Sequence, residues 1–177
     1  SWLSEKLAPR STVHGVLVQV FGVGVLIAGK SGVGKSEAAL DLINRGHRLI
    51  ADDVVEVAEV SPLTLLGRCP AAIQHHMEIR GLGIINVREL YGTLATLDQH
   101  SIDLVVELIA TEPDSPVEHL GLDEDRYVLL NVGVPLVRLP VTPGRYLATL
   151  VEAAVRNQIL KTRGHFGARE FAAQVQR

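Results

Sequence analysis

The stretch Gly29-Lys30-Ser31-Gly32-Val33-Gly34-Lys35-Ser36 decides how the fold of this chain is interpreted. It fits the pattern G-x-x-x-x-G-K-[ST] of a phosphate-binding loop, in which backbone N–H groups point at phosphate oxygens. In such a loop the Lys35 ammonium reaches the terminal phosphates and the Ser36 hydroxyl binds Mg²⁺. A helix that begins here also turns its positive end toward the phosphates. We therefore expect a nucleotide site at this stretch.

The sequence on both sides of the loop predicts the strand, loop and helix that such a site requires. Residues 24–28 are a short apolar run typical of a buried strand. After the loop, apolar residues share one helix face, and these are Ala38, Ala39, Leu42 and Ile43. Gly46 is suited to end this helix.

A second β-rich run precedes the loop strand and predicts a mixed sheet. Residues 15–21 are separated from 24–28 only by a turn at Gly22, which predicts an antiparallel hairpin. An antiparallel neighbour excludes an all-parallel sheet. Further strands are expected at 47–50, 54–60, 64–66, 102–109, 128–131 and 134–139, helices at 87–91, 145–163 and 168–176, and an exposed loop at 111–126. The fold class is therefore α/β, with a mixed sheet, a phosphate loop and flanking helices.

Composition limits the classes of function that are open to the chain. Its 177 residues, 47% of them hydrophobic, suffice for one domain with a core. A net charge of -3 and 4% aromatic residues argue against a nucleic-acid binder. Cys69 is the only cysteine, so we expect no internal disulfide and a buried, unreactive thiol. Without a signal peptide or a long apolar run, we expect a cytoplasmic protein that does not enter a membrane.

Several polar residues are candidates for chemistry. Asp52 and Asp53 follow a short apolar strand, and because strand neighbours point to opposite sides, one carboxylate could face the metal and the other the reacting hydroxyl. Glu78 and Arg80 flank a glycine-rich run, whose Gly81 and Gly83 suggest that the backbone closely approaches another group. The position of His14 before the first strand gives it little functional weight by itself. His75 and His76 lack the spacing of a helical metal pair and are expected at the surface.

At this point the sequence resembles the catalytic domain of bacterial HPr kinase/phosphorylase. The stretches that carry the resemblance are 13–17, the phosphate loop, 45–53, 78–87, 140–145 and 152–157. Of these, 78–87 resembles the family's own signature and is the most specific. The resemblance implies a fold like that of phosphoenolpyruvate carboxykinase, a linker at 1–11 from a missing N-terminal domain, a catalytic domain at 12–177 and a hexameric assembly.

The resemblance also implies an activity. Enzymes of this family use ATP and Mg²⁺ to phosphorylate a serine of HPr, the phosphocarrier protein of the sugar phosphotransferase system. They reverse the reaction by phosphorolysis, in which inorganic phosphate attacks the phosphoserine and pyrophosphate leaves.

The matching motifs then imply a role for each residue. Asp53 is the base in the forward direction and the acid in reverse, with His14 beside it, and Lys35 holds phosphates. Ser36, Asp52 and Glu78 serve Mg²⁺. The signature residues Glu78, Arg80, Gly81, Gly83 and Asn86 serve both directions, and Pro140 and Arg145 chiefly the reverse one.

Three positions depart from the family pattern. Lys30 stands where the family usually has aspartate, and Asn86 replaces an aspartate common in the signature. His119 aligns with an arginine that contacts the phosphate or the substrate serine, and an imidazole cannot replace a guanidinium fork. Two alternatives to the kinase/phosphorylase therefore stay open: a nucleotide-binding regulatory module with weakened transfer, and a kinase of a small hydroxylated molecule.

Overall fold

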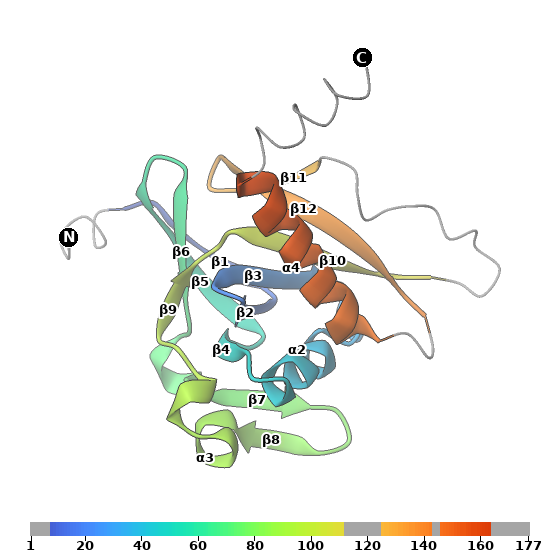
Figure 1. Ribbon diagram of the computed structural model, residues 1–177. Helices are drawn as coiled ribbons and strands as arrows, with labels where there is room; N and C mark the ends of the chain where they lie inside the picture. Colours follow the sequence, from blue (N-terminus) through green and yellow to red (C-terminus); the bar gives the residue numbers. More distant parts are fainter. Residues whose placement is uncertain (1–7, 112–124, 143–145, 164–177) are drawn as a thin grey trace.

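A six-stranded mixed sheet forms the centre of the computed structural model, which describes residues 8–111, 125–142 and 146–163 (Figure 1). In spatial order its strands are β11 (Asp125–Leu129), β12 (Val132–Val141), β10 (Leu104–Ala110), β3 (Val23–Gly29), β2 (Val16–Val20) and β4 (Arg48–Ala51). The three strands β12, β10 and β3 run parallel, whereas β11, β2 and β4 pair antiparallel with their neighbours. The expected mixed sheet is confirmed.

The predicted hairpin beside the loop strand is present. Val20 of β2 pairs with Val23 of β3, which leaves a two-residue turn at Phe21 and Gly22. Both turn residues have positive φ, 50° and 81°, as a type I′ turn requires. The turn therefore fixes the register of the strand that leads into the phosphate loop.

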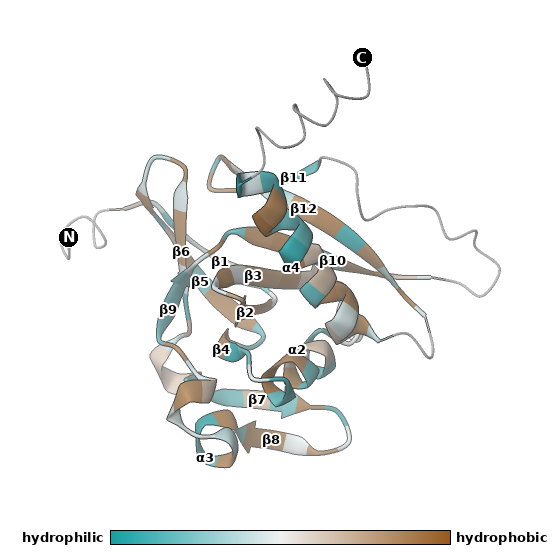
Figure 2. Ribbon diagram, in the orientation of Figure 1, coloured by the Kyte–Doolittle hydropathy of each residue, from teal (hydrophilic) through white to brown (hydrophobic). Residues whose placement is uncertain are grey.

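Two helices cover one face of this sheet, α2 (Lys35–Asn44) and α4 (Leu147–Arg163). They pack on the strand residues whose side chains alternate toward them, which include Val16, Val18, Val25, Ile27, Leu104, Val106 and Leu108. Figure 2 shows hydrophobic residues concentrated in the central strands, which are buried on both faces. The four predicted apolar residues of α2 are all buried.

A four-stranded antiparallel sheet covers the other face. In spatial order it contains β1 (Arg10–His14), β5 (Val54–Ser61), β6 (Thr64–Arg68) and β9 (Gln99–Ser101). Val55, Val57 and Leu65 of this sheet pack against Leu17 and Leu26 of the central one. Two sequence expectations change here: β1 extends two residues into the expected linker, and His14 ends the first strand instead of preceding it.

A smaller hairpin and several short helices complete the described chain. The hairpin joins β7 (His76–Ile79) to β8 (Gly83–Asn86), and the short helices are α3 (Val87–Tyr91), η1 (Ala71–Ile73) and η2 (Thr93–Ala95). Figure 1 places the hairpin next to α2, on the side away from β11, with α3 beyond the hairpin. Among the described helices, none has the length and apolar character needed to cross a membrane.

Some expected segments differ from the structure or lie outside it. The exposed loop expected at 111–126 ends earlier, because β11 already begins at Asp125. Residues 112–124 of that loop, with His119, lie outside the described residues. So do Arg145 and the helix expected at 168–176.

Candidate functional site

The phosphate loop connects the carboxyl end of β3 to the first turn of α2. Gly29 must be glycine, because a Cβ there would lie 2.8 Å from the Leu108 carbonyl oxygen and 2.9 Å from Val33 Cγ1. Gly34 adopts a φ of 106° at the N-cap of α2, a backbone conformation that other residues rarely adopt. The loop can therefore wrap closely around a ligand and leave the first N–H groups of the helix pointing into it.

The Lys35 side chain is already held inside the loop. Its Nζ donates to the carbonyl oxygens of Gly29, at 2.9 Å, and Lys30, at 3.0 Å. These contacts bring the ammonium back over the loop instead of leaving it in solvent. A cation in this position is suited to terminal phosphate oxygens.

Ser36, which is half-buried, and Asp52, which is buried, form a polar pair beside the loop. The Ser36 hydroxyl donates to Asp52 Oδ1 at 2.7 Å, and the backbone N–H of Glu78 donates to Asp52 Oδ2 at 3.1 Å. Asp52 is only 5% exposed. Burial raises the pKa of the Asp52 carboxyl, an effect that the Ser36 and Glu78 hydrogen bonds oppose and the Asp53 charge reinforces.

Asp53 lines the same cavity as Asp52, and neither residue lies in a strand, so the strand geometry assumed for this pair is wrong. The physical reason is that β4 ends at Ala51, before either aspartate. The chain then closes a tight turn, in which the Val54 N–H donates to the Asp52 carbonyl oxygen at 2.8 Å. Asp53, at the centre of this turn, has a φ of 68°, which is uncommon for a residue other than glycine. The Asp53 side chain is exposed, in contrast to the buried Asp52.

The end of β1 brings His14 to Asp53. His14 pairs with Val54 in the β1–β5 register, and the next N–H along the chain, that of Gly15, donates to the Asp53 carbonyl oxygen at 3.0 Å. The strained turn at Asp53 is thus fixed from the neighbouring strand. His14, which sequence spacing alone left as a weak candidate, lies beside the exposed carboxylate.

Strand β7 supplies the third side of the site. Its alternation buries Met77 and Ile79 in the core and leaves Glu78 and Arg80 outside. Arg80 reaches the phosphate loop, since a Cβ added to Gly32 would lie 3.0 Å from Arg80 Nη2. The signature stretch therefore places one acid and one guanidinium against the loop.

Together these elements enclose a cavity of about 720 Å³, which we call the loop cavity. Eleven of the residues that the sequence identified line it: His14, Gly29, Ser31, Gly32, Gly34, Lys35, Ser36, Asp52, Asp53, Glu78 and Arg80. Its volume lies within the range of small-molecule sites, roughly 300–1,000 Å³. Lys35 of the loop and Arg80, just after β7, line the cavity together with the carboxylates of 52–53 and 78, which is the charge pattern that a phosphate–metal complex needs.

Other predicted residues have different surroundings. Val33 packs against Gly29, and Lys30 lines a separate hollow that also includes Glu107. Asn86 caps α3, accepting from the Glu89 N–H at 3.0 Å. Pro140 lies in β12, in register with Ile109.

The close approach expected at Gly81 and Gly83 is not made to any part of the described chain. A Cβ added to either glycine would meet no described atom within 4 Å. Both have positive φ, 85° and 100°, in the turn between β7 and β8. They are therefore explained by the turn itself.

The oxygen donors beside the phosphate loop decide whether Mg²⁺ fits this site. Within the described ranges, no three His, Cys, Asp or Glu side chains gather closely enough to hold a metal by themselves. Mg²⁺ is usually bound through one or two carboxylates together with substrate phosphates and water. The hydrogen-bonded pair of Ser36 and Asp52, with Glu78 on the same cavity, fits that mode and does not fit an all-protein metal cage.

Sequence reasoning missed Glu37, which lines the loop cavity from the first turn of α2. Its position directly after Lys35-Ser36 was the available signal, because the first turn of that helix had to face the ligand. Two further expectations are confirmed: Cys69 is buried, with 5% of its surface exposed, and His76 lies at the surface. Burial raises the pKa of the Cys69 thiol to about 11, so it stays protonated at neutral pH.

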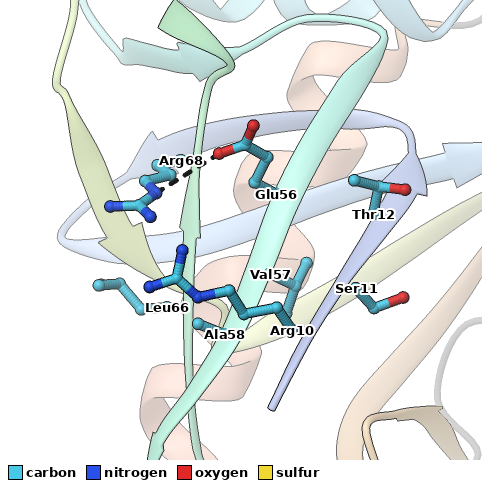
Figure 3. A pocket seen from close by; sticks show the side chains of 8 residues that line it. All are labelled: Arg10, Ser11, Thr12, Glu56, Val57, Ala58, Leu66 and Arg68. Atoms are coloured by element: carbon cyan, nitrogen blue, oxygen red, sulfur yellow. Dashed lines mark ion pairs between the residues drawn. The ribbon is translucent and has the colours of Figure 1, made fainter. Parts of the chain in front are cut away.

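A different pocket, of about 510 Å³, lies on the outer face of the four-stranded sheet (Figure 3). Its charged lining includes Arg68 and Glu56, whose Nε and Oε2 atoms lie 3.5 Å apart in an ion pair. It contains no residue of the phosphate loop and neither Asp52 nor Asp53. The loop cavity is therefore the better candidate for the active site.

Comparison with known proteins agrees with this geometry. The family described as "HPr Serine kinase C-terminal domain" matches residues 5–175. HPr kinase/phosphorylase from Geobacter sulfurreducens is 52% identical over 170 residues, which cover 96% of this chain and 53% of that protein. The corresponding protein from Geobacillus thermodenitrificans is 50% identical over 175 residues, which cover 99% of this chain and 57% of that protein.

A solved structure agrees as well. The Hpr(Ser) kinase/phosphatase from Coxiella burnetii superposes with a TM-score of 0.79 at 35% identity, over 91% of this chain and 98% of that chain. The chain spans about half the length of the curated relatives that it matches. The family match, the identity to these relatives and the superposition agree with one another. The chain belongs to the HPr serine kinase C-terminal domain family.

Proposed function

We propose that this chain carries the catalytic domain that transfers the terminal phosphoryl group of ATP to a serine of HPr, and that removes it again by phosphorolysis. One observation carries the proposal: the phosphate loop, the Ser36–Asp52 pair, Asp53 with His14, and Arg80 all line a single cavity. Four separate parts of the chain contribute to it, and each supplies a group that phosphoryl transfer needs.

In the forward direction the serine Oγ attacks the γ-phosphorus as its bond to the bridging oxygen of ADP breaks. The attacking hydroxyl must lose its proton, and the exposed Asp53 carboxylate is placed to accept it. Lys35 and Arg80 balance the charge of the phosphoryl oxygens, which spreads in the transition state. His14 orients and tunes Asp53 from the end of β1.

In the reverse direction inorganic phosphate attacks the phosphorus of phosphoserine, and the serine oxygen leaves. The same Asp53, now protonated, gives its proton to that oxygen, and pyrophosphate is the second product. Both directions can use one carboxyl, because proton acceptor and proton donor exchange roles when a reaction is reversed.

Mg²⁺ fits beside the loop, where Ser36, Asp52 and Glu78 would hold it. Bound there with the phosphates, it would neutralise charge that develops on them. The remaining protein groups bind, orient and move the proton as described.

The assembly and location follow from the same proposal. A hexamer is expected from the resemblance, and large exposed apolar side chains support self-association: Leu82, Ile84, Leu90 and Leu94. Sedimentation should then show a particle well above monomer mass, and a monomer at micromolar concentration would contradict the hexamer. A cytoplasmic location is part of the proposal, as is a linker at 1–11 that joins this catalytic domain to an N-terminal domain.

The direct experiment uses purified chain, Mg²⁺, labelled ATP and HPr. We expect label on a serine of HPr, and pyrophosphate when phosphoserine-HPr is then given inorganic phosphate. Transfer to free serine but not to HPr would indicate the small-molecule kinase instead. ATP binding without any transfer would indicate a regulatory module.

A further inference from the structure

A second cavity, of about 370 Å³, adjoins the loop cavity at the carboxyl ends of β3 and β10. We call it the strand-end hollow. The residues that line it include His14, Gly29, Lys30, Glu107, Ile109 and Tyr127. His14 and Gly29 line both cavities. A group bound in the hollow would therefore lie directly beside the terminal phosphate site.

The hollow exists because the four-stranded sheet covers only part of the central sheet. On the covered part, Leu26 and Val105 are in register and are 1% and 0% exposed. Two residues further along β10 on the same face, Glu107 is paired in register with Arg138, and the two side chains are 28% and 35% exposed. This change from buried apolar to partly exposed charged residues on one face of β10 marks the edge of the area that the four-stranded sheet covers.

The wall between the two cavities is thin. Gly29 approaches β10 so closely that a Cβ would lie 2.8 Å from the Leu108 carbonyl oxygen. No side chain of residue 29 separates a ligand in the hollow from the loop. His14, beside Asp53, lies on the other part of this shared wall.

The walls of the hollow carry opposite charges. Lys30 projects from the phosphate loop and makes no ion pair within the described part of the chain. On the strand side, Glu107 Oε1 lies 3.5 Å from Arg138 Nε, and Arg138 is also held by Asp125, with Nη1 and Oδ2 2.6 Å apart. Arg138 is thus shared between two carboxylates, and Glu107 keeps capacity for another cation. A purely anionic ligand would be repelled by Glu107, and an uncharged small molecule would use neither wall.

We propose that the strand-end hollow receives the serine-bearing segment of the protein acceptor, with Lys30 pairing an acidic side chain of that segment and Glu107 a basic one. Ile109 and Tyr127 supply apolar contact between the two charged walls. This inference rests on the proposed function and adds to it the residues that select the acceptor. It also gives Lys30 a role on the acceptor side of the loop, away from the phosphates.

Two charge reversals test the inference, Lys30→Glu and Glu107→Lys. Each should raise KM for HPr about tenfold, because a like charge then faces the incoming segment. For Glu107→Lys, which lies on β10 outside the phosphate loop, kcat at saturating HPr should stay near wild type. Nucleotide affinity of Glu107→Lys, measured by calorimetry, should not change. The matched control is Asp98→Lys, a reversal at an exposed position that lines neither cavity, and its KM should equal that of wild type.

The outcomes separate the inference from the proposed function. If wild type phosphorylates HPr and both reversals keep the wild-type KM, the inference is overturned and the proposed function stands. A fall in nucleotide affinity of Glu107→Lys that parallels its loss of HPr affinity would also overturn it, because the hollow would then act through the loop. If wild type transfers nothing to HPr, the proposed function fails and the inference fails with it.

Discussion

The two ends of helix α2 are built for different purposes. At its N-terminal end Gly34, Lys35 and Ser36 face the loop cavity, and within the described ranges the Lys35 ammonium donates to carbonyl oxygens of the loop itself. At its C-terminal end Gly46 has a φ of 98°, and the backbone N–H groups of Gly46 and His47 donate to the carbonyl oxygens of Ile43 and Leu42. This is a Schellman arrangement, which satisfies the helix end internally.

Side chains close the C-terminal end further, through what we call the Glu152 cluster: Arg45, His47, Thr149 and Glu152. Glu152 on α4 accepts from Arg45 Nη1, and its Oε2 lies 2.8 Å from His47 Nε2. Arg45 Nη2 also donates to Thr149 Oγ1 at 2.8 Å. The His47 ring meets Phe21 edge-on at 4.9 Å, so the β2–β3 turn joins the same contact.

The comparison shows how one helix serves both ligand and core. The C-terminal end is saturated by protein partners and holds the helix against α4 and the hairpin. The N-terminal end keeps its polar groups directed into a cavity, where a phosphate can replace the loop's own carbonyls as partner of Lys35. Substitutions at the two ends should therefore change different measurements.

The largest effect is expected beside the N-terminal end, at Asp53. Asp53→Asn keeps the shape and the positive φ, which asparagine tolerates, but cannot accept the serine proton. Transfer to HPr and phosphorolysis should both fall by about 10²–10⁴-fold, the usual contribution of a general base. Radiolabel transfer and pyrophosphate release measure the two directions.

Asp52→Asn is the matched control for that variant. It should keep proton transfer but require more Mg²⁺, because a carboxylate beside Ser36 is lost. If Asp53→Asn retains either direction near the wild-type rate, the two aspartates have exchanged roles or neither is the base.

The next effect is expected at Lys35. Lys35→Ala removes charge-assisted hydrogen bonds to the terminal phosphates, each worth roughly 1.5–3 kcal/mol. ATP affinity by calorimetry should fall roughly tenfold to a hundredfold, since about 1.4 kcal/mol corresponds to a factor of ten. The control is Lys161→Ala, at an exposed position in the last turn of α4, and this variant should bind ATP as wild type does.

The smallest effect is expected at the C-terminal end, and it depends on pH. The His47 hydrogen bond, followed by that from Arg45, holds the pKa of Glu152 below its ordinary value of 4.5. A carboxyl whose pKa is lower in the folded protein than in the unfolded chain stabilises the fold at pH values above the unfolded pKa. This contribution to stability is lost as the pH falls through the folded pKa. Glu152→Gln should therefore lower the free energy of unfolding by about 1 kcal/mol at neutral pH, a figure kept small because Glu152 is partly exposed. A loss of this size lowers Tm by roughly 2–4 °C.

That difference in Tm should shrink as the pH is lowered below 4.5. Melting curves of both proteins across this range measure it. A difference that stays constant with pH would mean that the Glu152 charge contributes nothing to stability.

The local features of the site could be predicted from sequence. The loop, the β2–β3 hairpin and the buried face of α2 depend on short-range spacing, and all three are confirmed. The resemblance added Glu78 and His14, whose spacing alone carried little weight. Both line the loop cavity.

The predictions that failed depended on where strands end and on which elements lie next to each other in the fold. The opposite orientation expected for Asp52 and Asp53 requires the extended backbone to continue through them, but β4 stops at Ala51, a tight turn follows, and both residues line one cavity. The strand-end hollow had no sequence signal, because Glu107 and Tyr127 meet only when β10 and β11 flank β12. Such contacts follow from sheet order, which local patterns do not contain.

The central claim is that ligand binding and anchoring occupy opposite ends of α2. The most direct measurement is the melting temperature of Lys35→Ala and Glu152→Gln, each with and without ATP and Mg²⁺. Lys35→Ala should melt like wild type but lose most of the ATP-induced rise, whereas Glu152→Gln should melt lower and keep the full rise. A Lys35→Ala protein that keeps the full ATP-induced rise, or a Glu152→Gln protein that loses it, would contradict the claim.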